Sequence, residues 1–170
     1  EDIPLFWDAW DVEFYYKDKP YPVGKPSKWR VVENGPIRVA VEVEIPLTAD
    51  STLTQQISLT SLSPRLDFNT QVKWHESHKF LKVAFPTTIR SPNATYEVQF
   101  GHLQRPTHSN TSWEKAQFEV HAQKWADLSE YNYGVSILND CKYGYSAEGN
   151  VITLSLLRAP KAPDADCDMG

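Results

Sequence analysis

The alternation that decides the fold is clearest in residues 39–45, whose sequence is VAVEVEI. Every second residue is valine or isoleucine, and alanine or glutamate stands between them. Successive side chains of an extended strand point to opposite faces, so a period of two gives a strand with one buried face. We therefore predict a strand here whose apolar face is covered by another part of the fold.

The same alternation recurs along most of the chain. It is found in residues 10–14, 53–59, 66–74, 81–85, 96–100, 118–120, 135–137 and 152–156. Helical periodicity is nearly absent, and turn-forming residues such as those at 34–36 and 148–150 separate the segments. About ten short strands with turns between them predict an all-β fold, an antiparallel β-sandwich, with residues 1–170 as a single domain.

Composition excludes several classes of partner. The chain has 17 Lys and Arg residues against 22 Asp and Glu residues, a net charge of −5, and it has no basic stripe. Neither nucleic acid nor an anionic membrane is therefore expected as a partner. No apolar run approaches the ~20 residues of a membrane-spanning helix, and the first residues lack a signal-peptide pattern. We expect a soluble chain.

Cysteine usage bears on the compartment. Cys141 and Cys167 do not make a disulfide framework, which favours a reducing compartment and hence the cytoplasm. Two tripeptides, at 93–95 and 110–112, fit the N-glycosylation pattern and favour the secretory route instead. Such tripeptides often arise by chance, so they carry little weight.

The histidines do not form a recognisable metal site. His75 and His78 are three positions apart after a predicted strand, whereas the metalloprotease motif has its histidines four apart on a helix. A solvated turn is the favoured interpretation. His102, His108 and His121 have no Cys or carboxylate at ligand spacing. We predict no complete metal site and no cofactor in this chain.

Catalytic motifs are missing as well, but sugar-binding residue types are abundant. The sequence has no Gly-x-Ser-x-Gly motif and no phosphate-binding glycine loop, so taken alone it is predicted to be non-catalytic. Its six tryptophans and eight tyrosines have flat apolar faces that can cover the C–H face of a pyranose. Under the favoured alternative, Trp10, Trp74 and Trp125 lie at core-facing strand positions and only fill space.

Five longer segments resemble one enzyme family in the same order along the chain. They are IPLFWDAWDVEFYY (3–16), SPRLDFNTQVKWHESHKFLKVAFP (63–86), FPTTIRSPNATYEVQFGHLQRPTHSNTSWE (85–114), WADLSEYNYGVSILNDCKYGYS (125–146) and LSLLRAPKAPDADCDMG (154–170). Together they resemble the C-terminal half of the glycoside hydrolase family 38 α-mannosidases, in their cytosolic and vacuolar branch. The resemblance covers nearly the whole chain.

This resemblance implies a galactose-mutarotase-like super-sandwich and a function within a larger enzyme. The zinc ion, the carboxylate nucleophile and the general acid of such an enzyme are expected upstream of Glu1, so this chain alone is expected to be inactive. Retention through a glycosyl-enzyme intermediate needs two carboxylates about 5–5.5 Å apart. The substrate class implied is terminal α-mannose on free oligosaccharides and N-glycans.

The resemblance also suggests residues that contact the sugar. Other branches of the family use an arginine that follows a Gly-Val-Ser-x-Leu-x-Asp-like turn, and here Arg158 follows the segment 134–140. The match is imperfect, because Cys141 stands where those branches have glycine and a longer hairpin precedes the arginine. We therefore take as candidate substrate-binding residues Arg158, Asn139, Asp140, Lys142, Arg105 and His108. In the alternative, 139–142 is a self-bonded turn in which Asp140 and Lys142 satisfy each other.

Three functions remain open at this point. The first is a β domain that buttresses the upstream catalytic domain of the same polypeptide and lends residues to the rim of the sugar site. The second is an independent lectin-like module, and the third a purely structural interface module. The full-length enzyme is a candidate homo-oligomer in the cytoplasm, or in a vacuole or lysosome reached from the cytosol. The Pro- and Asp-rich tail 159–170 is expected to be a cut connection.

Overall fold

Twelve strands and two short helical segments make up the regular structure of residues 1–161, the part of the chain that this computed structural model describes. The strands form three four-stranded sheets in which every pairing is antiparallel. This confirms the all-β, antiparallel prediction. The tail 162–170, including Cys167, lies outside the described residues, and so does the expectation of a cut connection there. Within residues 1–161 no helix is long and apolar enough to cross a bilayer.

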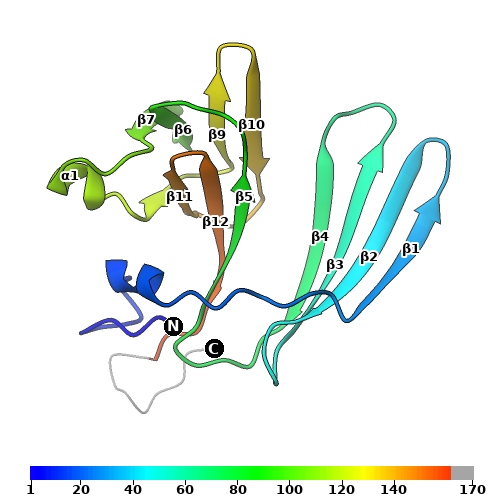
Figure 1. Ribbon diagram of the computed structural model, residues 1–170, viewed down its shortest axis with the longest axis horizontal. Helices are drawn as coiled ribbons and strands as arrows, with labels where there is room; N and C mark the ends of the chain where they lie inside the picture. The colour runs from blue at the N-terminus through cyan, green and yellow to red at the C-terminus, as the bar shows by residue number, and fades with distance from the viewer. Residues whose placement is uncertain (162–170) are drawn as a thin grey trace.

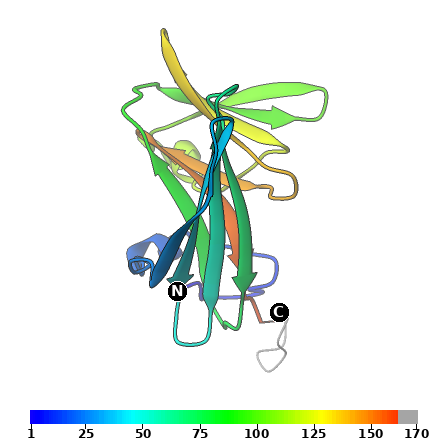
Figure 2. The same cartoon turned by 90° about the vertical axis from the view of Figure 1, so that its right-hand side faces the viewer.

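Sheet A is a meander of the first four strands. These are β1 (Lys28–Asn34), β2 (Arg38–Pro46), β3 (Thr52–Thr60) and β4 (Leu66–Lys73). Figure 1 shows sheet A on the right, apart from the other two sheets, and Figure 2 shows it from its outer side. The register places the apolar residues of all four strands on one face, as in the row Val31, Val41, Ile57 and Phe68.

The other face of sheet A is polar. Arg30 pairs with Glu42 at 2.7 Å and Lys28 with Glu44 at 3.0 Å, each pair joining directly opposed residues of β1 and β2. The VAVEVEI segment thus forms β2 as predicted, with its glutamates facing solvent. Its apolar side is only partly covered, because other residues of that face, such as Trp29 at 71% and Leu66 at 53%, remain exposed.

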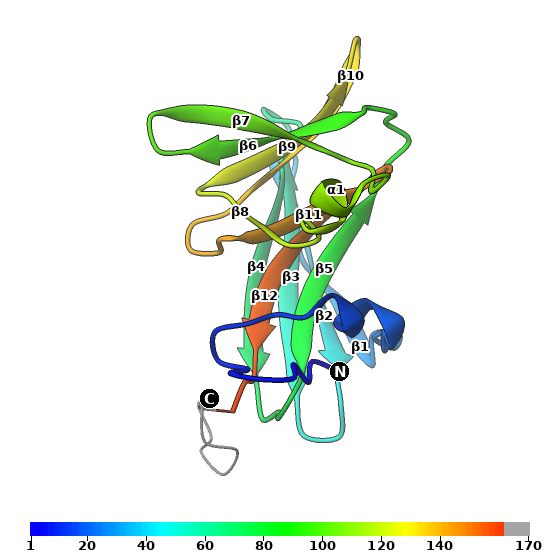
Figure 3. The ribbon, with the colours of Figure 1, turned by 90° about the vertical axis from the view of Figure 1, so that its left-hand side faces the viewer.

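The remaining strands form two sheets that enclose the core. Sheet B contains β5 (Phe80–Pro86), β12 (Val151–Arg158), β11 (Gly144–Glu148) and β8 (Val120–His121), in that order. Sheet C contains β10 (Tyr133–Leu138), β9 (Trp125–Glu130), β6 (Asn93–Val98) and β7 (Gly101–Pro106). Figure 3 shows sheet C above sheet B. Their facing side chains form one cluster of buried residues: Ile89, Ala94, Tyr96, Ala122, Ala126, Leu128, Ile137, Tyr145, Ile152 and Leu154.

Aromatic contacts connect the sheets. Tyr96 of sheet C meets Tyr145 of sheet B edge to face, with ring centroids 6.3 Å apart. Phe68 of sheet A meets Phe85 of sheet B in the same way at 6.0 Å. Edge-to-face pairs of this kind contribute beyond the apolar area that they bury. Sheet A therefore touches the rest of the fold through few side chains, whereas sheets B and C share a continuous core.

The N-terminal segment corrects one strand prediction. Residues 10–14 form no strand: Trp10 and Asp11 donate backbone hydrogen bonds to the carbonyl of Trp7, and a 3-10 helix, η1 (Phe14–Asp18), follows. Trp10 is 70% exposed, so its assignment to the core was wrong. Alternation over five residues can also arise in a turn, when local backbone hydrogen bonds replace a strand partner.

Two further expectations were wrong. Phe100 is not the end of a strand, because its φ of 62° places it in the turn between β6 and β7. Trp125 does not face the core, since Ala126 and Leu128, which alternate with it on β9, are the buried residues of that strand. Trp74 follows β4 and is half-buried. Strands β1, β7, β9 and β11 were not among the predicted segments.

Candidate functional site

Arg158 is the last residue of β12 and holds the N-terminal segment. Its Nε donates to the Asp2 carboxylate and its Nη2 to the backbone carbonyl of Asp11. The Asp2 side chain is 2% exposed and that of Arg158 17%. Figure 3 shows the N-terminal segment running across the lower ends of β5 and β12. The arginine therefore has a structural partner in addition to the sugar contact predicted for it.

The segment 139–142 is a self-bonded turn between β10 and β11. The Asn139 side chain accepts a hydrogen bond from the backbone N–H of Lys142 at 2.5 Å and donates to the hydroxyl of buried Tyr145. Lys124 donates from its ammonium group to the carbonyl of Asp140. Within the described part of the chain no ion pair joins Asp140 to Lys142, so the turn closes through Asn139 and not through those two charges.

Arg105 is in β7, and His108 lies in the segment between β7 and helix α1. The Arg105 guanidinium lies 4.8 Å from the centroid of the Tyr96 ring, and its Nη1 is buried with no hydrogen-bond partner among residues 1–161. Burial lowers the pKa of the Arg105 guanidinium, against the opposing charge of Tyr96. His108 Nδ1 is 3.4 Å from Glu114, which belongs to the capping box of helix α1 (Ser112–Lys115).

The six candidate residues are thus spread over three places. Arg158 ends a strand of sheet B, Arg105 is on sheet C, and 139–142 connects these two sheets. Among residues 1–161 no hydrogen bond or ion pair joins one of these places to another. The chain on its own does not assemble them into one cluster.

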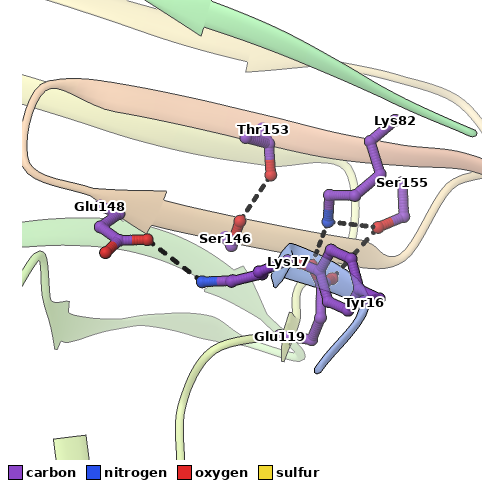
Figure 4. A network of polar contacts seen from close by, with 8 residues as sticks. All are labelled: Tyr16, Lys17, Lys82, Glu119, Ser146, Glu148, Thr153 and Ser155. Carbon is purple, nitrogen blue, oxygen red and sulfur yellow. Dashed lines mark hydrogen bonds and ion pairs between the residues drawn. The ribbon is translucent and has the colours of Figure 1, made fainter. Parts of the chain in front are cut away.

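A different polar cluster, which the sequence analysis missed, is fully connected. Glu119 accepts from the Tyr16 hydroxyl at 2.6 Å and from the Ser155 hydroxyl at 3.1 Å, and it forms an ion pair with Lys82 (Figure 4). Lys82 also donates to Ser155 at 3.1 Å. The Lys82 and Glu119 side chains are 16% and 14% exposed. The cluster thus joins η1, β5, β12 and the segment before β8.

Burial shifts the pKa values of two members of this cluster. Desolvation lowers the pKa of the Lys82 ammonium, and the nearby Glu119 carboxylate only partly opposes that shift. Desolvation, with the negative charge of Glu119, raises the pKa of the Tyr16 hydroxyl far above that of a free tyrosine. The sequence held one signal of a buried polar cluster, namely single charged residues within apolar segments. These are Lys82 in FLKVAF and Glu119 between Phe118 and Val120. Their partner could not be found because the four residues come from distant segments.

The cluster lies beside a groove of about 700 Å³ between sheet A, sheet B and the N-terminal segment. Aromatic rings of Tyr16, Tyr21, Trp74 and Phe80 line it together with paired charges. Lys17 and Glu148, also in the groove, form an ion pair at 3.1 Å (Figure 4). Of the carboxylates that line the groove, Glu1 and Glu148 each pair with a lysine, and Glu76 accepts a hydrogen bond from the Thr48 hydroxyl.

Metal ligands do not gather in this part of the molecule. Among the described residues there is no group of three His, Cys, Asp or Glu side chains that could hold an ion. His78 is 3.6 Å from Asp8, and Glu76 accepts from the Thr48 hydroxyl. Cys141 is a free, exposed cysteine.

Comparisons with known proteins give a consistent result. Residues 1–166 match the model of the glycosyl hydrolases family 38 C-terminal domain. The whole chain is 54% identical to α-mannosidase 2C1 of Mus musculus, 51% to α-mannosidase G of Dictyostelium discoideum and 49% to an α-mannosidase of Saccharomyces cerevisiae. It spans 16% of the length of each of these relatives.

Solved structures show the same fold. An α-mannosidase from Enterococcus faecalis V583 superposes with a TM-score of 0.72 at 18% identity. The match covers 83% of this chain and 20% of that protein. At this level of identity the similarity concerns the fold of the three sheets.

Proposed function

Because the chain belongs to the C-terminal domain family of the family 38 glycosyl hydrolases, we propose that it is the β domain of an α-mannosidase. The relatives that share about half of its residues are named α-mannosidases, and each is much longer than this chain. The proposal takes residues 1–170 as one β domain of a larger polypeptide. The catalytic carboxylates belong to another part of that polypeptide, upstream of Glu1.

The proposed reaction is the hydrolysis of terminal α-mannose from free oligosaccharides and N-glycans with retention of configuration. Two carboxylates about 5–5.5 Å apart would carry it. The proposal assigns the zinc of the enzyme to the upstream part of the polypeptide; among the described residues there is no ligand set for a metal. The proposal further takes the enzyme to be a homo-oligomer in the cytoplasm, with a vacuole or lysosome as the alternative compartment.

The proposed role of this chain is to buttress the catalytic domain, and one observation carries it. One face of sheet A is mainly apolar, with Gln55 and Thr70 bonded to each other on it, and there Trp29, Val31, Leu66 and Phe68 are 44–71% exposed. Exposed apolar patches of this kind are unusual on the surface of a monomeric soluble protein and indicate an interface. Burying them against the rest of the polypeptide would complete the sandwich and attach the domain.

The proposed rim residues keep unused donors for a sugar. Within residues 1–161 no hydrogen bond engages Nη1 of Arg158, although its Nε and Nη2 hold the N-terminal segment. Nη1 of Arg105 also has no partner there, but it is buried against Tyr96, so a sugar contact of Arg105 requires this side chain to move outward. Guanidinium groups are strong donors to hydroxyls and carboxylates. Asn139, Asp140, Lys142 and His108 complete the proposed set.

An independent lectin-like module is the second candidate, and a purely structural interface module the third. The open apolar face of sheet A argues against the second, because a free-standing module would have to leave that face in water. The hydrogen bonds that Arg158 and Asn139 make within the fold favour a purely structural role for those two residues. The unengaged Nη1 of Arg158 distinguishes the leading proposal from the third candidate.

Matched substitutions on the two faces of sheet A test the buttress. Val31→Lys, on the apolar face, should lower the free energy of unfolding of the whole polypeptide by about 1–3 kcal/mol, because the lysine would be buried unpaired. Thr54→Lys lies on the polar face, in the row of Lys28 and Glu44, and should have little effect. Thermal denaturation measures the loss in each variant. Equal losses in the two variants would contradict the proposal that the apolar face of sheet A packs against the catalytic domain.

Activity is tested separately. The whole polypeptide should hydrolyse an aryl α-mannoside, whereas the 170-residue chain should show no turnover and bind no stoichiometric zinc. Turnover by the purified chain that survives a chelator would contradict the assignment of the catalytic residues to another part of the polypeptide.

A further inference from the structure

The outer face of sheet C carries a row of side chains that point away from the core. The register places Trp125 opposite Leu138 on β10, and Glu97 of β6 opposite His102 of β7. The residues that alternate with them, such as Ala126 and Tyr96, are the buried ones. Trp125 is therefore on the solvent side of the sheet, half-buried beside Leu138 and His102, rather than in the core.

The row contains two aromatic rings close to each other. The His102 and Trp125 rings have centroids 6.4 Å apart and planes inclined by 41°. Tryptophan offers a large flat apolar surface with a polar edge, which suits a ligand that has one apolar and one polar side. Hexopyranoses have this form, because their C–H groups lie on one face and their hydroxyls point outward.

A carboxylate on the same face is already held in position. Asp127, two residues from Trp125 on β9, accepts hydrogen bonds at 2.7 Å from the hydroxyls of Ser129 and Ser136, one on each of its oxygens. Gly134 lies opposite Ser129, and any Cβ at 134 would collide with the Ser129 hydroxyl. The glycine thus makes room for the hydroxyl that orients the carboxylate.

Charge selects the class of ligand. The outward positions of the four strands carry the carboxylates Glu97 and Asp127 and no lysine or arginine. Phosphates and acidic peptides would be repelled. A neutral polyol can donate its hydroxyls to the remaining lone pairs of Asp127, which can accept more than the two bonds that it has.

We propose that the outer face of sheet C binds a neutral hexopyranose, with the sugar stacked on Trp125 and bonded through its hydroxyls to the preoriented Asp127. The site uses none of the six residues proposed for the rim of the sugar site, and it stands whether or not the polypeptide is an α-mannosidase. The conformation of Asp127 and the position of Trp125 exist before any ligand arrives, so little ordering cost accompanies binding.

The test uses the whole polypeptide labelled with 5-fluorotryptophan. Trp125→Phe assigns the fluorine resonance of Trp125, and Trp113, which is 83% exposed on α1, serves as the internal control. Methyl α-D-mannopyranoside is titrated in the presence of a saturating α-mannosidase inhibitor, so that a catalytic site cannot account for the response. The Trp125 resonance should shift saturably while that of Trp113 stays in place.

Two variants make the result decisive. Asp127→Ala should weaken the apparent affinity at least about tenfold, the loss of one good charge-assisted hydrogen bond. Gly134→Ala, which displaces Ser129 but keeps the carboxylate, should weaken it less. An unmoved Trp125 resonance, equal shifts at Trp113, or an affinity unchanged in both variants would overturn the proposal. If a lysine-rich peptide, and not the sugar, shifted the Trp125 resonance saturably, the proposal would be overturned in favour of a cationic partner.

Discussion

Arg158 and Asp2 form a buried ion pair although 156 positions separate them in the sequence. The pair fixes the beginning of the chain to the end of β12, the last strand among the described residues. Two further bonds strengthen this junction: Arg158 holds the carbonyl of Asp11, and the backbone N–H of Lys161 donates to Asp8 at 2.6 Å. The two ends of the described chain are therefore closed against each other by charge-assisted hydrogen bonds.

Removing the arginine should destabilise the fold. Arg158→Ala leaves the Asp2 carboxylate buried without a partner, which costs about 3–5 kcal/mol of the free energy of unfolding. Asp2→Ala combined with Arg158→Ala should cost less than the sum of the two single variants, because the stranded charge is gone. Urea denaturation of the three variants measures the coupling. Additive losses would mean that the two side chains do not interact in solution.

Kinetics separate this structural role from a role in sugar binding. If Nη1 of Arg158 contacts the sugar as proposed, Arg158→Ala should lower kcat/KM per folded enzyme by ten- to a thousand-fold, about 1.4–4 kcal/mol. Asp2→Asn disturbs the same junction but leaves the donor in place, and it should change kcat/KM much less. Equal kinetic losses in the two variants would reduce Arg158 to a positioning residue.

At the turn 139–142, two variants likewise distinguish a structural role from a role in sugar binding. Asn139→Ala removes the bonds to the Lys142 N–H and to the hydroxyl of buried Tyr145, so we expect a loss of about 1–3 kcal/mol in unfolding free energy. Asp140 uses only its backbone carbonyl in a bond to Lys124, and Asp140→Ala should change stability by less than about 0.5 kcal/mol. A drop in kcat/KM for Asp140→Ala at unchanged stability would support its place at the sugar rim.

Buried tyrosines predict a loss of stability in alkali. Burial raises the pKa of Tyr96 and of Tyr145 to about 12, and burial with the charge of Glu119 raises the pKa of Tyr16 further. Between pH 10 and these values the unfolded chain releases protons that the folded chain keeps, so stability falls as the pH rises through this window. Lys82, whose pKa burial lowers, contributes in the opposite direction below about pH 10.5.

Absorbance of tyrosinate checks this expectation. Three of the eight tyrosines should ionise later than free tyrosine or only together with unfolding. Tyr16→Phe should reduce the slope of stability against pH above pH 10, since it removes the residue with the largest shift. Simultaneous ionisation of all eight tyrosines in the folded protein would show that these hydroxyls are open to water.

Period-two alternation identified β2 and several other strands, but it missed β7, which has little contrast, and also β9, in which buried Ala126 and Leu128 alternate with polar residues. The segment VAVEVEI forms β2, in which the valines and the glutamates lie on opposite faces of sheet A, whereas β7, GHLQRP, is mostly exposed and carries little pattern. Residues 10–14 show the converse error, since their alternation belongs to a turn and η1. The pattern reports a difference in polarity between the two sides of a segment, and a strand forms only where another segment supplies the backbone partners.

Site residues were harder to predict for a related reason. The cluster of Tyr16, Lys82, Glu119 and Ser155 draws on four segments, and no spacing in the sequence connects them. Arg158 was identified through the family resemblance, but its partner Asp2 could not be, because pairing across 156 positions depends on how the N-terminal segment crosses sheet B. Tertiary partners of charged residues are decided by the path of the chain.

Gly144 gives the sharpest test of that cluster. A Cβ added at 144 would lie 2.9 Å from Cβ and 3.0 Å from Oγ of Ser155, the hydroxyl that bridges Lys82 and Glu119. Gly144→Ala should therefore force Ser155 away and lower the free energy of unfolding by about 1–3 kcal/mol. Gly101→Ala is the matched control, because nothing lies within 4 Å of its Cβ position, and it should be nearly neutral. In Ser155→Gly both obstructing atoms, Cβ and Oγ, are absent, so a subsequent Gly144→Ala should cost less than in the parent chain. Equal costs in both backgrounds, measured by urea denaturation, would mean that the strain at 144 does not act through Ser155.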